Sequence, residues 1–294
     1  MTGATGLIGH AVARSLADAG HSILTVGRGD ECDVHFDLAK DRGVDPTALA
    51  GCAALIHAAG VTDEDFSDPD AALAKATAGA GALVEAARLA GVRRLVYFSS
   101  AHVYGPLEGV IDESRAPNPQ TRYAKAHILT EERFRSTAAA LLIARPCAVF
   151  GMPPSLDRFA RWSLIPFDFP RQALGGRIVL KSSGAQRRNF VSAEGLGALA
   201  GWWLAQGSTG VTIANAPGPH EMPVYEFALL CARIGQEETG RYCAIERPAS
   251  QGAPAIEAGE PLEYRTRVGG HLPGMLLEDH VRGLVRALLK KAHP

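Results

Sequence analysis

The chain has 294 residues, of which 47% are hydrophobic and 21% charged, so it is long enough for one large α/β domain or for a domain with a smaller lobe. A net charge of −1 and a pI near 6.8 exclude the basic surface of a nucleic-acid-binding protein and a polybasic membrane patch. No apolar run reaches the roughly 18 residues of a membrane span, and no signal-peptide pattern is present. The five cysteines stand singly, without the paired spacing of a zinc site or a disulfide framework. We therefore expect a cytoplasmic protein with no metal, no nucleic-acid partner and no membrane partner.

A glycine-rich stretch begins the chain, with the spacing G-x-x-G-x-x-G over residues 3–9. Apolar residues then recur at helical spacing up to Gly20, which predicts an amphipathic helix after the glycines. Such a turn lets backbone N–H groups approach a pyrophosphate, and the helix directs its positive end at the anion. The predicted cofactor-binding residues of this turn are Gly3, Thr5, Gly6, Leu7, Ile8 and Gly9.

A phosphate-binding turn normally follows a buried strand, which lies at the centre of a doubly wound sheet. Here only Met1 and Thr2 precede Gly3. Two interpretations are open: the natural start lies upstream, or the first strand is nearly absent.

The second predicted strand, residues 22–26, ends at Gly27 and Arg28. In a dinucleotide-binding fold this strand end meets the adenine ribose, where an acid favours NAD and an arginine favours the 2′-phosphate of NADP. Gly27 takes the acidic position and Arg28 follows it. The sequence therefore favours NADP, while NAD stays open because Asp30 can reach a ribose hydroxyl.

Further buried strands are predicted at residues 34–38, 53–60 and 94–100, with helices between them. This alternation predicts parallel βαβ units: an α/β, Rossmann-type doubly wound sheet over residues 1–150 that binds a dinucleotide. His57 is expected to be a core residue. The strand ends add further cofactor-binding candidates, which are Asp37, Leu38, Ala58, Ala59 and Gly60.

The pattern changes after residue 150 to proline-rich segments and short elements, followed by helices at 193–204, 223–234 and 276–291 and a loop-rich stretch at 245–274. We expect residues 151–294 to form a smaller substrate-binding lobe, interleaved with the last elements of the sheet.

Two hydroxyl residues suggest the chemistry. Ser100 ends a buried strand, and Tyr123 lies near the start of a predicted helix over residues 121–135. The carboxyl end of a parallel sheet is where such folds place their active sites. A phenol that exchanges a proton and a serine that holds the same oxygen suit hydride transfer at a carbonyl or an alcohol.

With these residues in place, the chain resembles the extended short-chain dehydrogenases/reductases of the NAD-dependent sugar-nucleotide epimerase/dehydratase family. The resemblance spans nearly the whole chain, and its motifs occur in order. They are Thr2-Gly3-Ala4-Thr5-Gly6-Leu7-Ile8-Gly9, Ile56-His57-Ala58-Ala59, Phe98-Ser99-Ser100-Ala101-His102-Val103-Tyr104-Gly105, Tyr123-Ala124-Lys125-Ala126-His127, Ala144-Arg145-Pro146-Cys147-Ala148-Val149-Phe150-Gly151 and Arg188-Asn189-Phe190-Val191.

The resemblance implies an NAD(P)-dependent oxidoreductase or epimerase acting on a nucleotide-activated sugar. It assigns Ser100 and Tyr123 as catalytic residues. Ser100 and His102 would also contact the substrate, and Arg188 would grip its diphosphate. Tyr123 and the residue four positions later would hold the cofactor as well. A homodimer is possible on the same grounds.

Two departures from the family pattern stand out. The lysine expected four residues after the tyrosine is His127, and Lys125 points to another helical face. The usual asparagine of the preceding long helix is replaced by Ala76 or a neighbour. A protonated His127 would favour the Tyr123 phenolate, so we expect a narrow pH window of activity. The alternative is a dinucleotide-binding regulatory or scaffold protein with little or no turnover.

Overall fold

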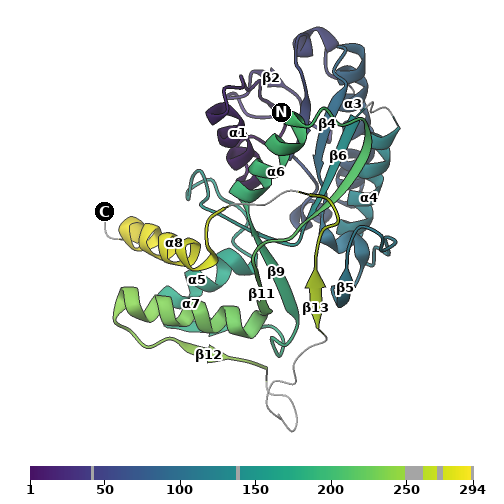
Figure 1. The fold of residues 1–294 in the computed structure, drawn as a ribbon. Coiled ribbons are helices and arrows are strands. Elements are labelled where there is room, and N and C mark those ends of the chain that lie inside the picture. The colour runs from purple at the N-terminus through teal and green to yellow at the C-terminus, as the bar shows by residue number, and fades with distance from the viewer. Residues whose placement is uncertain (41–42, 137–139, 249–260, 270–273, 293–294) are drawn as a thin grey trace.

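A computed structural model describes residues 1–40, 43–136, 140–248, 261–269 and 274–292. The chain folds into two lobes (Figure 1). A parallel sheet flanked by helices forms the larger, N-terminal lobe, and the other lobe gathers three helices of the second half of the chain around a small sheet.

The main sheet is parallel throughout. Its strands run in the order β10 (Gly210–Ala216), β6 (Ala140–Pro146), β4 (Arg94–Phe98) and β3 (Leu55–His57). Thr2 forms parallel bridges to His57 of β3 and to Val26 of β1 (Val26–Gly27), which pairs with β2 (Val34–His35). Met1 and Thr2 thus occupy the central strand position, where the strand order reverses. This order confirms the predicted doubly wound fold.

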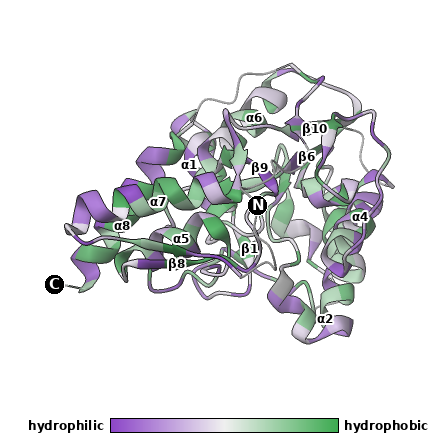
Figure 2. Cartoon of the chain, turned by 90° about the horizontal axis from the view of Figure 1, so that it is seen from below, coloured by the Kyte–Doolittle hydropathy of each residue, from purple (hydrophilic) through white to green (hydrophobic). Residues whose placement is uncertain are grey.

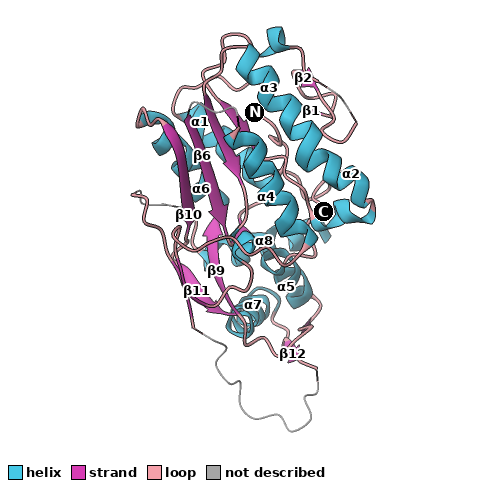
Figure 3. Ribbon diagram, turned by 90° about the vertical axis from the view of Figure 1, so that its right-hand side faces the viewer, coloured by secondary structure: helices cyan, strands magenta, loops and turns pink. Residues whose placement is uncertain are grey.

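Helices cover both faces of this sheet (Figure 3). On one face lie α1 (Leu7–Asp18) and α6 (Ala193–Ala205), and on the other lie α3 (Ala80–Leu89) and α4 (Arg122–Arg135). A Cβ added to Gly197 of α6 would lie 2.9 Å from Cβ of Ser15, so α1 and α6 pack backbone to backbone. Figure 2 shows hydrophilic and hydrophobic residues alternating along α1 and α4, and the buried residues of α1 recur at helical spacing, as expected of an amphipathic helix.

The long alanine-rich helix has an irregularity in its middle. Asp68 accepts from the backbone N–H of Ala71 and caps α2 (Pro69–Ala74). A π-helical turn (Lys75–Gly79) follows before α3 begins. Gly79 is needed there, because an added Cβ would lie 1.9 Å from the carbonyl oxygen of Leu38.

The second lobe is built on β7 (Ala148–Phe150), β9 (Arg187–Ser192) and β11 (His220–Pro223), with β9 between the other two. Two parallel pairs of short strands complete the described sheets, β8 (Arg177–Val179) with β12 (Ala244–Glu246) and β5 (Gly109–Ile111) with β13 (Leu262–Tyr264). The helices are α5 (Ile165–Leu174), α7 (Val224–Thr239) and α8 (Leu277–Ala292). Short 3-10 turns cover Pro46–Leu49, Asp63–Ser67 and Ala101–Tyr104.

The structure corrects one expectation in this lobe. The proline-rich region after residue 150 contains the ten-residue helix α5. Pro166 lies in its first turn, where no N–H is needed. Pro170 lies inside the helix and cannot donate to the carbonyl of Pro166, but Nε2 of His280 on α8 lies 2.9 Å from that oxygen. A tertiary hydrogen bond therefore replaces the missing helical one.

Several predicted boundaries also shift. The strand predicted at 22–26 is reduced to Val26–Gly27, and the helix predicted at 223–234 continues to Thr239. Much of the predicted loop at 245–274 lies outside the described residues. None of the helices in the described ranges has the length and apolar composition that crossing a membrane requires.

Candidate functional site

The glycine turn lies at the point where the strand order of the sheet reverses. Gly3 has φ +71°, and a Cβ added there would lie 2.7 Å from the carbonyl carbon of Ala58. A Cβ on Gly9 would lie 1.9 Å from the carbonyl oxygen of Gly3. Gly6 begins α1, and no side chain caps this helix among the described residues. The start of α1 is therefore open to an anion. The backbone at Gly3 and the backbone that follows β3 at Ala58 lie in close contact beside it.

The next two strand ends carry the residues predicted to meet the adenosine. Arg28 is exposed directly after β1. A Cβ added to the preceding Gly27 would lie 2.9 Å from Sγ of Cys32, so a larger side chain at this position would require Cys32 to move. Asp37 accepts from the N–H of Ala39, and Leu38 is buried.

Ser100 lies at the carboxyl end of β4 with 3% of its surface exposed. Its Oγ accepts a hydrogen bond from the N–H of His102 at 3.2 Å. Because this bond uses a lone pair, the hydroxyl proton is available for another acceptor.

Tyr123 lies in the first turn of α4, which Thr121 caps through the N–H of Ala124. Its ring meets the ring of His127 edge to face, with centroids 4.5 Å apart, and the ring of His102 at 6.1 Å. The structure thus brings together the three rings that the sequence singled out. Lys125 is exposed, as its helical position predicts.

His127 is buried, with 3% of its surface exposed, and Nδ1 lies 2.6 Å from the hydroxyl of Tyr97. Burial, together with the charges of His102 and Arg161, lowers the pKa of His127 to about 3. His127 is therefore neutral near pH 7, which removes the imidazolium on which the expected pH window rested. Nε2 of His127 is buried and has no hydrogen-bond partner in the described part of the chain.

A buried ionic network holds α4 against the sheet, and the sequence analysis missed it. Glu131 accepts from both Nε (3.0 Å) and Nη2 (2.6 Å) of Arg145 and from the hydroxyl of Ser99 (2.7 Å). The guanidinium of Arg145 also lies over the ring of Tyr104, 4.8 Å from its centroid. Tyr123, His127 and Glu131 recur every four residues, and this polar stripe is the signal that could have identified Glu131.

His57, at the end of β3, and Arg161, in the segment before α5, both interact electrostatically with His127. Nδ1 of His57 lies 2.7 Å from the hydroxyl of Thr2, and its ring stacks on Phe134, which confirms its core role. Nε of Arg161 is buried and lies 3.5 Å from Oε2 of Glu64, an ion pair that does not meet hydrogen-bond geometry. No motif marked Arg161, because it lies in an irregular segment before α5.

Arg188 is placed on β9 in the second sheet, opposite Met222 of β11. Its Nη1 donates to the carbonyl of Arg187 at 2.8 Å.

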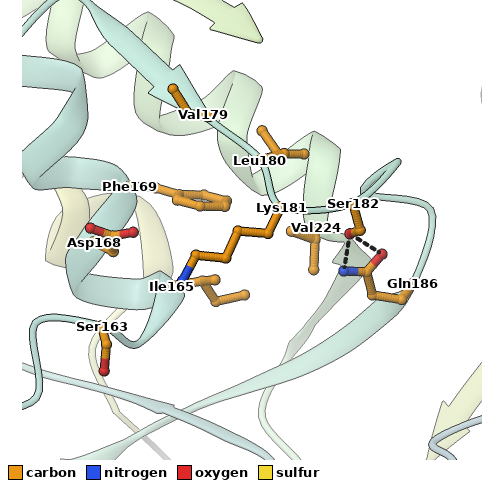
Figure 4. Close-up of a pocket in the computed structure, with 10 residues that line it drawn as sticks. All are labelled: Ser163, Ile165, Asp168, Phe169, Val179, Leu180, Lys181, Ser182, Gln186 and Val224. Carbon is orange, nitrogen blue, oxygen red and sulfur yellow. Dashed lines mark hydrogen bonds between the residues drawn. The ribbon is translucent and has the colours of Figure 1, made fainter. Parts of the chain in front are cut away.

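A pocket of about 100 Å³ opens in the same lobe (Figure 4). The pocket is lined by the apolar side chains of Ile165, Phe169, Leu180 and Val224. The side chain of Lys181 crosses it. Ser182 and Gln186 hydrogen-bond to each other at its edge. Sequence reasoning missed this pocket, because its residues come from separate elements and share no motif.

Within the described ranges, no group of three or more potential metal-binding side chains is found.

Comparisons with known proteins agree with this geometry. The sequence profile of the NAD dependent epimerase/dehydratase family matches residues 1–214. UDP-glucose 4-epimerase of Streptomyces lividans is 31% identical over 160 residues, which are 48% of this chain and 47% of that protein. The chain therefore aligns with about half the length of this curated relative.

Solved structures share the fold over nearly the full chain. UDP-glucuronic acid 4-epimerase from Bacillus cereus, in complex with UDP-glucuronic acid and NAD, has a TM-score of 0.75 at 16% identity, covering 98% of each chain. DesIV, a dTDP-glucose 4,6-dehydratase from Streptomyces venezuelae with NAD and TYD bound, has a TM-score of 0.75 at 21% identity, covering 99% of this chain and 97% of its own. RMD from Pseudomonas aeruginosa, complexed with NADPH, has a TM-score of 0.72 at 20% identity, covering 98% and 97%. With a family profile that matches 214 of its 294 residues, the chain belongs to the NAD-dependent epimerase/dehydratase family.

Proposed function

We propose that this protein is an NAD(P)-dependent epimerase or ketoreductase that acts on a nucleotide-activated sugar. The observation that carries the proposal is the cluster of Tyr123, His127 and His102 at the end of the sheet where the glycine turn approaches β3. In this proposal residues 1–150 bind the dinucleotide and residues 151–294 bind the substrate. In the same proposal, the protein works in the cytoplasm as a homodimer.

The residues present fit a dinucleotide. The close approach of Gly3 and Ala58 leaves backbone in place of side chains where a pyrophosphate would lie over α1. The unpartnered Nε2 of His127 is a buried polar group that a ribose hydroxyl would satisfy. The nicotinamide would supply the acceptor or donor of hydride.

NADP is the preferred cofactor in our proposal. Cys32 crowds the position at Gly27 where an NAD-binding acid would stand, and Arg28 is exposed next to it. A guanidinium can pair with the 2′-phosphate of NADP. With NADP, a net ketoreductase is favoured over an epimerase that recycles its own cofactor.

The chain's own residues then divide the proton chemistry. Tyr123 would exchange the proton of the sugar hydroxyl, and Ser100 would donate its free hydroxyl proton to the same oxygen. Arg188 would pair with the diphosphate. The pocket between α5 and β8 would take the nucleotide base between apolar side chains, with Ser182 and Gln186 at one polar edge and the side chain of Lys181 across it (Figure 4).

Solved relatives support this substrate class, because those named above were crystallised with UDP-glucuronic acid, NAD or NADPH. The test is to identify the cofactor carried by the purified protein and then to screen nucleotide sugars for turnover, with matching free sugars as controls. We expect turnover of at least one nucleotide sugar and a large loss in Tyr123→Phe. A folded, cofactor-loaded protein that converts none of them would favour the regulatory alternative.

A further inference from the structure

Tyr97 is a buried tyrosine in the middle of β4 that none of the family motifs assigns a role. Its side chain has no exposed surface, and its hydroxyl lies 2.6 Å from Nδ1 of His127. The ring also packs against Phe134 and His57. Both partners of the hydrogen bond are therefore fixed by packing, one by the sheet and the other by α4.

The direction of this hydrogen bond follows from the protons available. Burial raises the pKa of Tyr97 well above its ordinary value, so the phenol keeps its proton. The hydroxyl of neighbouring Thr130 donates its single proton to the carbonyl of Ala76 or Ala126, and in the described part of the chain Nδ1 of His127 is the one acceptor that forms a hydrogen bond with the Tyr97 hydroxyl. His127 is neutral near pH 7, because burial lowers its pKa to about 3. Tyr97 is thus the donor and Nδ1 the acceptor.

A neutral imidazole that accepts at Nδ1 carries its proton on Nε2. This Nε2–H is buried and meets no acceptor among the described residues. The ring edge lies at the turn after β3, where a Cβ on Gly60 would be 3.4 Å from Cε1 of His127. The orphaned donor therefore lies at the end of the sheet that approaches the glycine turn, beside the ring of Tyr123.

We propose that Tyr97 is a positioning residue that fixes His127 as the Nε2–H tautomer, so that His127 holds the cofactor ribose as a neutral hydrogen-bond donor rather than as a cation. This inference rests on the proposed function, because it needs a dinucleotide in the cleft. The charges that act on His127 come from His102 and Arg161, and both disfavour its protonation. The lysine expected at this position would supply both a donor and a charge, and the Tyr97–His127 pair supplies the donor alone.

The first experiment determines the tautomer in the cofactor-free protein by long-range ¹H–¹⁵N correlation NMR with labelled histidine. The signals of His127 are assigned with His127→Ala. We expect a protonated Nε2 and an unprotonated Nδ1 in the unaltered protein, and a mixture of tautomers in Tyr97→Phe, which keeps the ring and removes the hydroxyl. The control is Tyr264→Phe, which removes a buried hydroxyl that donates to the carbonyl of Arg145 and should leave the His127 signals unchanged.

The second experiment measures the affinity for NADPH and NADH by calorimetry in the same variants. Losing the hydrogen bond that orients His127 should weaken binding roughly three- to tenfold in Tyr97→Phe. The same change made in a His127→Ala background should have no further effect, because Tyr97 acts through His127.

A proton on Nδ1 of His127 in the unaltered protein would overturn the proposal, and so would equal cofactor affinity in Tyr97→Phe and the unaltered protein. An equal loss in both backgrounds would assign Tyr97 a structural role only and also overturn it. If neither cofactor binds the unaltered protein, the proposed function fails, whereas the tautomer still decides the assignment of Tyr97 by itself.

Discussion

At the scale of single residues, position 127 decides how Tyr123 can act as a base. A lysine would place an ammonium beside the phenol and lower the tyrosine pKa from its ordinary value of about 10. Neutral His127 supplies no such charge. In the direction of alcohol oxidation, turnover by the unaltered protein should therefore rise toward alkaline pH, with no acidic limb from His127 near pH 6.5.

His127→Lys should shift the rise of turnover with pH, the alkaline limb of the pH–rate profile, to lower pH. At neutral pH, turnover should increase by roughly tenfold for each unit by which the tyrosine pKa falls. The measurement is kcat against pH on one confirmed substrate. The matched control is His127→Gln, which keeps a donor, adds no charge and should leave the limb in place. An acidic limb near pH 6.5 that disappears in His127→Gln would show that the imidazolium takes part after all.

Arg28 determines cofactor choice in our account. The unaltered protein should bind NADPH more tightly than NADH, by roughly tenfold or more, because a charge-assisted pair with phosphate is worth about 1.5–3 kcal/mol. Arg28→Ala should remove this difference, while the exposed Arg241→Ala in the other lobe should preserve it. Calorimetric titrations that give equal affinity for the two cofactors in the unaltered protein would refute the NADP preference.

At the scale of elements, α5 depends on a contact from outside itself. Pro170 leaves the carbonyl of Pro166 without its helical partner, and His280 of α8 satisfies it. His280→Leu should destabilise the protein by about 1–3 kcal/mol, because a buried acceptor loses its donor. In a Pro170→Ala background, residue 170 has an N–H of its own, so the same change should cost less. Urea unfolding of the four proteins tests this coupling, and equal losses in both backgrounds would rule it out.

The elements that the sequence predicted correctly are those with local signals. Gly20 follows the end of α1, and the apolar runs at β3 and β4 form buried parallel strands. Helix α5 was missed because Pro170 breaks a helix locally, and only the distant His280 compensates.

The candidate site shows the same limit. Motifs identified Tyr123 and His127 and their shared face of α4, which the ring contact confirms. They could not give the charge of His127, because its burial depends on Tyr97 and Gly60, far away in sequence. Arg161 and the pocket next to α5 likewise need the tertiary structure, since no local pattern marks them.

At the scale of the whole molecule, buried histidines should make the protein sensitive to acid. Burial lowers the pKa of His57 and His127 to about 3 and that of His280 to about 4, against an ordinary 6.5. Below pH 6.5 the unfolded chain binds protons at these sites that the folded protein excludes, so stability falls as pH falls. Each histidine should cost about 2 kcal/mol between pH 6.5 and 5.

Urea unfolding across this pH range measures the effect. His280→Leu removes one of the three groups and should flatten the dependence by about a third. An unfolding free energy that is equal at the two ends of the range would contradict this account of the buried rings.

The central claim is that Tyr123 supports hydride transfer between a nicotinamide and a nucleotide-activated sugar. The most direct test is to mix the protein loaded with oxidised cofactor with single nucleotide sugars and record the absorbance of reduced nicotinamide. We predict that reduced nicotinamide forms with at least one nucleotide sugar, does not form with the free sugar, and is nearly abolished in Tyr123→Phe at unchanged cofactor occupancy. Full occupancy with no reduction by any nucleotide sugar, or equal reduction in Tyr123→Phe, would contradict the claim.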